Sequence, residues 1–92
     1  MARLKWTDDA LLQLEELLAE IAVDDPEAAA AVADTIDNAL RRLENFPESA
    51  PPYRAGVRRL SIPGLPVSCY YRYRGDTVRV LIVRHDKQKP LQ

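Results

Sequence analysis

The spacing of the apolar residues changes halfway along the chain, and this change constrains the fold more than any other feature. Before Pro47, large apolar residues recur every three or four positions, which is the pattern of helices with one apolar face. After Gly56, apolar and polar residues mostly alternate, which is the pattern of strands with one buried face. Because the two patterns are segregated along the chain, we expect an α+β fold. The two helical stripes consist of Leu11, Leu14, Leu18 and Ile21, and of Val32, Ile36, Leu40 and Leu43.

Local signals set the limits of the elements in the first half. Residues 3–6 alternate between polar and apolar and predict a short strand. Thr7 offers a hydroxyl to cap the first helix. Asp25 and Pro26 predict the start of the second, since aspartate caps helices and proline fits the first helical position. Pro47 is expected to end that helix. The short link between the helices predicts an antiparallel hairpin.

The second half begins as a proline-rich loop over residues 47–56 and continues as three strands. These strands are predicted at residues 57–62, 67–73 and 77–84. Pro63-Gly64 and Gly75-Asp76 suit tight turns, and strands joined by such turns run antiparallel. The expected order is β-α-α-β-β-β, with the helical hairpin packed on a small antiparallel sheet as a single domain over residues 1–92.

The last strand is expected to present two different faces. Val78, Val80 and Ile82 alternate as an apolar face that we expect to pack on the helices. The other face mixes charged and apolar groups, as an exposed binding surface does. It consists of Thr77, Arg79, Leu81, Val83 and His85. In the first of the three strands Arg58 alternates with Leu60, which predicts a position at the rim of the sheet.

Charge is distributed unevenly between the two halves. Residues 1–50 contain four basic and twelve acidic side chains, a net charge of −8, whereas residues 51–92 contain nine basic and two acidic ones, a net charge of +7. Such asymmetry indicates that the second half presents a cationic surface to an anionic partner. The alternative is that charges simply follow the solvated surface of each half.

Several function classes find no support in the sequence. The longest apolar run, residues 28–33, is far shorter than a membrane span, and the opening residues lack a secretory pattern. Cys69 is the only cysteine and His85 the only histidine, so neither a disulfide nor a metal site is expected. A glycine-rich phosphate loop and a nucleophile elbow are absent. We expect a cytoplasmic protein that binds no membrane and needs no metal or other cofactor.

Arginine and tyrosine are interleaved in the strand half. Arginine binds phosphates and tyrosine stacks on bases, so this combination is typical of nucleic-acid binding. It is equally favoured where a protein binds an acidic polypeptide. Alternatively, the tyrosines are half-buried strand residues. The candidate target- or partner-binding residues are Arg58, Arg59, Tyr71, Arg72, Arg79, Arg84, His85, Lys87 and Lys89. His85 follows the last strand and is a candidate for proton transfer, and the alternative is a surface histidine without catalytic function.

An ordered set of short segments resembles the ParE/RelE superfamily of toxins from type II toxin–antitoxin systems. Each segment is weak alone, but together they extend over nearly the whole chain. They are Leu4-Lys5-Trp6-Thr7, Asp25-Pro26-Glu27-Ala28, Leu43-Glu44-Asn45-Phe46-Pro47, Gly56-Val57-Arg58-Arg59-Leu60, Cys69-Tyr70-Tyr71-Arg72-Tyr73 and Val80-Leu81-Ile82-Val83-Arg84-His85.

The resemblance implies a toxin that forms a hetero-oligomer with a cognate acidic antitoxin. The antitoxin would cover the exposed sheet and the helical groove with an acidic, amphipathic segment. The positive charge of residues 51–92 is the physical counterpart of such a partner. Operator DNA would be contacted only through the antitoxin.

The superfamily contains two activities. RelE-like members cut messenger RNA on the ribosome and surround the scissile phosphate with basic residues, one of them in the middle strand. Ser68 stands at that position here, which leaves Arg58, Arg84 and His85 as an incomplete catalytic set. ParE-like members inhibit DNA gyrase by binding and need no catalytic group, and the Arg84-His85 ending resembles theirs. We favour the gyrase-directed toxin. The alternatives are a ribosome-dependent endoribonuclease and a non-toxic scaffold that only binds antitoxin.

Overall fold

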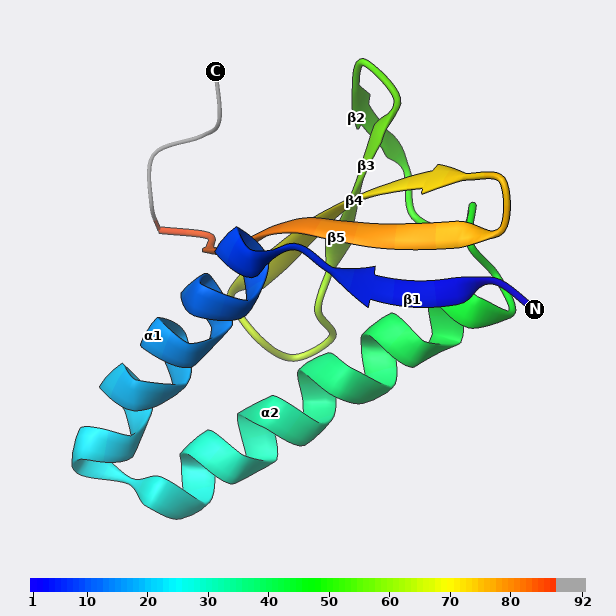
Figure 1. Cartoon of the computed structure of the whole chain (residues 1–92). Helices are drawn as coiled ribbons and strands as arrows, with labels where there is room; N and C mark the ends of the chain where they lie inside the picture. The colour runs from blue at the N-terminus through cyan, green and yellow to red at the C-terminus, as the bar shows by residue number, and fades with distance from the viewer. Residues whose placement is uncertain (88–92) are drawn as a thin grey trace.

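The computed structural model describes residues 1–87 and contains a helical hairpin and one five-stranded sheet (Figure 1). Its elements are β1 (Arg3–Trp6), α1 (Asp8–Asp24), α2 (Pro26–Arg41), the 3₁₀ turn η1 (Arg42–Glu44), β2 (Pro52–Arg54), β3 (Val57–Ser61), β4 (Val67–Arg74) and β5 (Thr77–His85). The α+β class and the expected element order are confirmed, with β2 added inside the stretch that the sequence predicts as loop. In the described part of the chain, no helix is both long and apolar enough to cross a membrane.

The sheet has the strand order β1-β5-β4-β3-β2. Strands β3, β4 and β5 are antiparallel, as expected. Strand β1, however, runs parallel to β5, so the sheet is mixed and not wholly antiparallel. The reason is topological: the helical hairpin and three strands separate β1 from β5, and such a long connection permits parallel pairing.

Both helices begin at the residues that the sequence indicates. The Thr7 hydroxyl accepts a hydrogen bond from the Ala10 N–H at 3.1 Å, and the Asp25 carboxylate accepts one from the Ala28 N–H at 3.0 Å. These side chains satisfy N–H groups that have no partner inside the helix. Helix α2 ends earlier than expected, at Arg41, and continues as η1 before the chain reaches Pro47.

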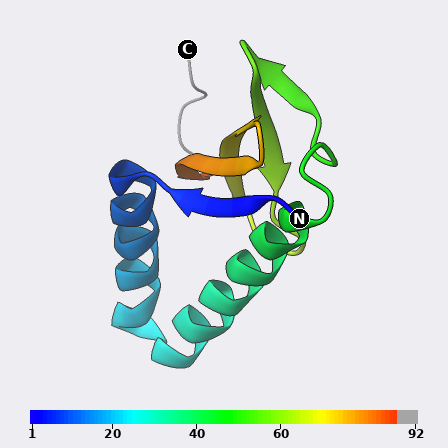
Figure 2. The same cartoon turned by 45° about the vertical axis from the view of Figure 1, so that its right-hand side comes forward.

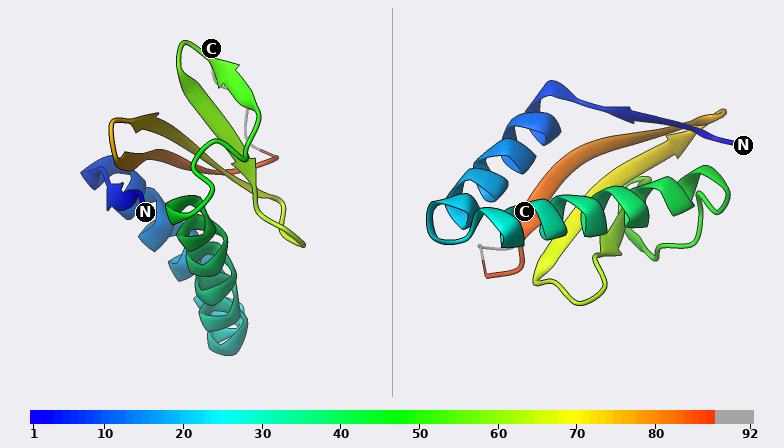
Figure 3. Two further views of the ribbon diagram at one scale, coloured as in Figure 1. Left: turned by 90° about the vertical axis from the view of Figure 1, so that its right-hand side faces the viewer. Right: turned by 90° about the horizontal axis from the view of Figure 1, so that it is seen from below.

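The helical hairpin packs on one face of the sheet, and the core lies between them (Figure 2). Helix α1 contacts β5 and α2, while α2 and η1 bring Ile36, Leu40 and Leu43 into the core. The sheet contributes Cys69, Tyr71, Val78, Val80 and Val83 to this cluster. The β2–β3 hairpin rises from the sheet on the side away from the helices (Figure 3).

A β-bulge changes which residues of β5 face the helices. Tyr70 pairs with Ile82 and Tyr71 pairs with Val80, so Leu81 is an extra residue in β5. A one-residue insertion reverses the alternation beyond it. Val83 is therefore buried in the core, whereas Ile82 lies on the opposite face and is only partly buried. The expectation that Ile82 packs on the helices and that Val83 faces away is wrong for this reason.

Candidate partner-binding surface

The face of the sheet opposite the helices, hereafter the open face, gathers the basic side chains of the strands. Strands β3, β4 and β5 contain six arginines and no aspartate or glutamate, whereas α1 and α2 contain nine acidic residues and one arginine. Strand register places Arg3, Lys5, Arg59, Ser68, Tyr70, Arg72, Arg74, Arg79, Ile82 and Arg84 on the open face. The charge asymmetry of the sequence is therefore also an asymmetry between the sheet and the helices.

Aromatic rings form part of this face beside the β2–β3 hairpin. Tyr53 of β2 stacks edge-on against Tyr70 of β4, with ring centroids 5.0 Å apart. The guanidinium groups of Arg54 and Arg59 lie 5.0 Å and 6.0 Å from the centroids of Tyr53 and Tyr70, respectively. Such cation–π contacts hold the arginine side chains against the aromatic rings. The sequence predicts only a loop over residues 47–56, so it does not reveal this hairpin.

A polar network occupies one end of the open face. The buried Ser68 hydroxyl donates to Asp86 Oδ1 at 2.7 Å and accepts from Arg59 Nε at 3.2 Å. Arg59 Nη2 also lies 3.5 Å from the same Asp86 oxygen. Arg84 pairs with Ser68 across the strands and so projects from the same face. Asp86 is a functional candidate that the sequence does not reveal, because nothing local links it to Ser68, 18 residues away.

Arg58 lies on the other side of the sheet. Its guanidinium donates to the carbonyl oxygens of Glu48 and Ala50 at 3.2 Å and 2.7 Å and forms an ion pair with the Glu48 carboxylate at 3.7 Å. Its position opposite Tyr71 on β4 directs it toward the helical side. Arg58 thus holds the loop before β2, and it lies on the opposite side of the sheet from Arg84, the other arginine among the catalytic candidates.

Tyr71 is also a structural residue. Its side chain is fully buried, and its hydroxyl donates to the Pro47 carbonyl oxygen at 2.8 Å. Burial raises the pKa of the phenol above its ordinary value. Tyr71 shares the helix-facing side of β4 with the buried Cys69 and the partly buried Tyr73, so its side chain belongs to the core and not to the open face.

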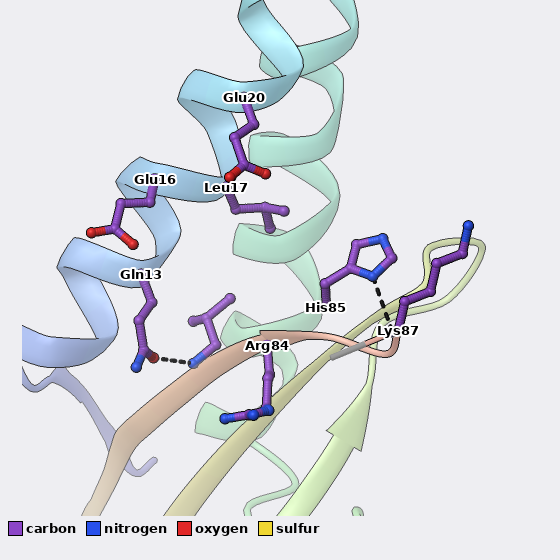
Figure 4. Close-up of a pocket in the computed structure, with 8 residues that line it drawn as sticks. Gln13, Glu16, Leu17, Glu20, Arg84, His85 and Lys87 are labelled. Carbon is purple, nitrogen blue, oxygen red and sulfur yellow. Dashed lines mark hydrogen bonds between the residues drawn. The ribbon is translucent and has the colours of Figure 1, made fainter. Parts of the chain in front are cut away.

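His85 and Lys87 lie beside a groove between α1 and the end of β5. The groove has a volume of about 510 Å³ and is lined by Gln13, Glu16, Leu17, Glu20, Val83, Arg84, His85 and Lys87. His85 and Arg84 project in different directions from neighbouring positions of β5 (Figure 4). His85 Nδ1 accepts the Lys87 backbone N–H at 3.1 Å, and Gln13 Oε1 accepts the Val83 N–H at 2.8 Å. Glu16 and Glu20 of α1 thus line the same groove as Arg84, His85 and Lys87 at the end of β5.

The remaining candidates occupy different positions. Arg79 is exposed on the open face, and Arg72 donates from Nη2 to the Ala55 carbonyl oxygen at 3.3 Å. The Nε atom of Arg72 is buried without a hydrogen-bond partner among residues 1–87. Lys89 lies outside the described residues. Over the same residues, no three histidine, cysteine, aspartate or glutamate side chains come together as a metal site.

The architecture is that of a toxin from a toxin–antitoxin system. It matches a chain of the structure titled "Chromosomal ParDE TA system from P. aeruginosa" with a TM-score of 0.79 and 27% identity, covering 92% of this chain and 96% of that one. The model of the family described as ParE toxin of type II toxin-antitoxin system, parDE, matches residues 4–90. A relative from Sinorhizobium fredii (strain NBRC 101917 / NGR234), named "Putative toxin Y4kP", is 39% identical over 88 residues, covering 95% of this chain and 91% of the relative. The chain belongs to the ParE toxin family.

Proposed function

We propose that this ParE-family toxin inhibits DNA gyrase by binding to it and that a cognate acidic antitoxin silences it in the cytoplasm. The antitoxin would form a hetero-oligomer with the toxin and supply the contacts to operator DNA. Family membership supports the toxin–antitoxin pairing. The distribution of charge, with a basic open face and acidic helices, supports an acidic partner.

One observation favours binding over RNA cleavage. The three candidate catalytic residues do not converge on one centre. Arg58 lies on the helical side, bound to the loop before β2, whereas Arg84 and His85 both line the groove beside α1 but project in different directions. The position at which RelE-like toxins carry a basic group is Ser68, whose hydroxyl is already bound to Asp86. Phosphodiester cleavage needs donors that converge on one developing charge, and these side chains do not supply such a centre.

A supercoiling assay tests the gyrase proposal. Purified toxin is expected to inhibit supercoiling by gyrase in proportion to its concentration, and addition of the antitoxin is expected to restore it, while translation in a cell-free system continues. Unaffected supercoiling at saturating toxin would contradict the proposal. Codon-positioned mRNA cuts that disappear in Arg84→Ala and His85→Ala would instead establish a ribonuclease, and induction without growth arrest would establish a non-toxic scaffold.

A further inference from the structure

We propose that Arg59 and Ser68 form a carboxylate-binding subsite of the open face, and that Asp86 occupies it until a side chain of an acidic polypeptide replaces it. This inference rests on the proposed function, because it names how an acidic partner engages the toxin. The subsite is defined by a shared acceptor: Asp86 Oδ1 receives the Ser68 hydroxyl at 2.7 Å and lies 3.5 Å from Arg59 Nη2.

The subsite is built into the fold. Ser68 is 1% exposed, and a buried hydroxyl without an acceptor destabilises the folded state. Two contacts fix the side chain of Arg59: its guanidinium lies over the Tyr70 ring, and its Nε donates a hydrogen bond to Ser68. The two donors therefore keep their positions on β3 and β4 whichever carboxylate they bind.

Asp86 is the exchangeable member of this network. It follows β5 immediately and is anchored through its backbone N–H to the Pro66 carbonyl oxygen at 2.7 Å. The side chains of Arg59 and Asp86 are 43% and 37% exposed, so solvent and a partner reach the contact. An ion pair this accessible is weak, so a competing carboxylate from a bound polypeptide has mainly to take over the hydrogen bond from Ser68.

Asp86, which fills the subsite in this structure, indicates the chemistry of the ligand. A single carboxylate oxygen is bound by one hydroxyl and one guanidinium, a charge-assisted arrangement that suits glutamate or aspartate of a partner. Arg84, opposite Ser68 in the register, adds positive potential from the same face. We therefore assign the subsite to an acidic polypeptide and not to a nucleic-acid phosphate.

The test compares Asp86→Ala with Asp76→Ala in the full chain. Asp76 pairs with Arg3 on the open face at 3.7 Å, so its removal changes the net charge equally without touching the subsite. Far-UV circular dichroism checks that both variants fold. The probes are a hexaglutamate peptide and inorganic phosphate, and the readouts are the affinity and the NMR shift of the Arg59 Nε–H.

Asp86→Ala is expected to bind hexaglutamate about fivefold more tightly than the unmodified chain, as removal of one competing hydrogen-bonded carboxylate predicts, and to shift the Arg59 signal. Asp76→Ala should show no such gain, and Ser68→Ala added to Asp86→Ala should abolish it. Equal affinities, an equal gain in Asp76→Ala, or a gain for phosphate as large as that for the peptide would each overturn the inference. None of these results alters the supercoiling assay, so the two proposals fail separately.

Discussion

At the scale of one residue, the core of the protein excludes water from the thiol of Cys69. The thiol is fully buried, and burial raises its pKa from 9.0 to about 12. A thiol held neutral in this way is a poor nucleophile. The folded protein therefore holds this proton more tightly than the unfolded chain does. The resulting contribution to the free energy of unfolding is complete below the pKa of the thiol in the unfolded chain, and it is lost as the pH rises through the pKa in the folded protein.

Stability toward urea is accordingly expected to fall between pH 9 and pH 12, by up to about 1.4 kcal/mol per pH unit. Tyr71 acts in the same direction, because burial also raises its pKa above 10.0. Urea unfolding curves measured at pH 8, 10 and 11 check the prediction. In Cys69→Ala the decline should be shallower, and an unchanged slope would show that the buried thiol is not its source.

Ala55 adopts a backbone conformation that favours glycine. Its φ is 46°, and together with Gly56 at 78° it forms the turn between β2 and β3. Because a Cβ atom is strained there, Ala55→Gly is expected to stabilise the protein by about 0.5 to 1 kcal/mol in chemical denaturation. The same change at the exposed Ala30 of α2 should destabilise it by about 1 kcal/mol. Destabilisation of similar size at both positions would contradict the strain argument.

At the scale of elements, Thr7 joins α1 to the sheet. Its hydroxyl caps α1 at Ala10 and donates to the Leu81 carbonyl oxygen at 3.3 Å, beside the bulge of β5. Thr7→Ala removes both interactions and is expected to lower the free energy of unfolding by about 1 to 2 kcal/mol. Thr7→Ser keeps the hydroxyl and should recover most of this loss. If the two variants are equally destabilised, the hydrogen bonds are not the cause.

The elements that local chemistry determines could be predicted from the sequence. Helix starts at Thr7 and Asp25 follow from capping, and the antiparallel strands follow from alternation and short turns. The bulge at Leu81 could not, because an inserted residue is visible only against its partner strand. The parallel pairing of β1 with β5 likewise depends on contacts between the two ends of the chain.

The positive charge of the candidate surface could be predicted from the sequence, but the residues that form it could not all be identified. Alternation correctly places Arg79 on the face opposite the helices. Arg58 and Tyr71 were indistinguishable by residue type from true surface groups, although carbonyl oxygens of the loop before β2 hold both in place. Asp86 could not be assigned, since its contact with Ser68 exists only once β4 and β5 pair.

At the scale of the whole molecule, the helical hairpin and the open face of the sheet carry opposite charge. An acidic polypeptide is attracted to the open face and repelled by the helices, so the partner is oriented before close contact forms. Salt screens such attraction, and the Debye length falls to about 3 Å at 1 M ionic strength. Association of toxin and antitoxin is therefore expected to slow markedly as salt is added, which stopped-flow measurements check. A rate independent of salt would contradict electrostatic steering.

On this account the antitoxin binds over the open face. The sharpest test compares the affinity of the antitoxin for Arg79→Glu with its affinity for Arg42→Glu. Both arginines are exposed and both substitutions change the charge equally, but Arg79 lies on the open face and Arg42 in η1. We predict that Arg79→Glu weakens binding about tenfold or more at 0.1 M salt, while Arg42→Glu leaves it nearly unchanged. Equal effects of the two substitutions, or none from Arg79→Glu, would contradict the account.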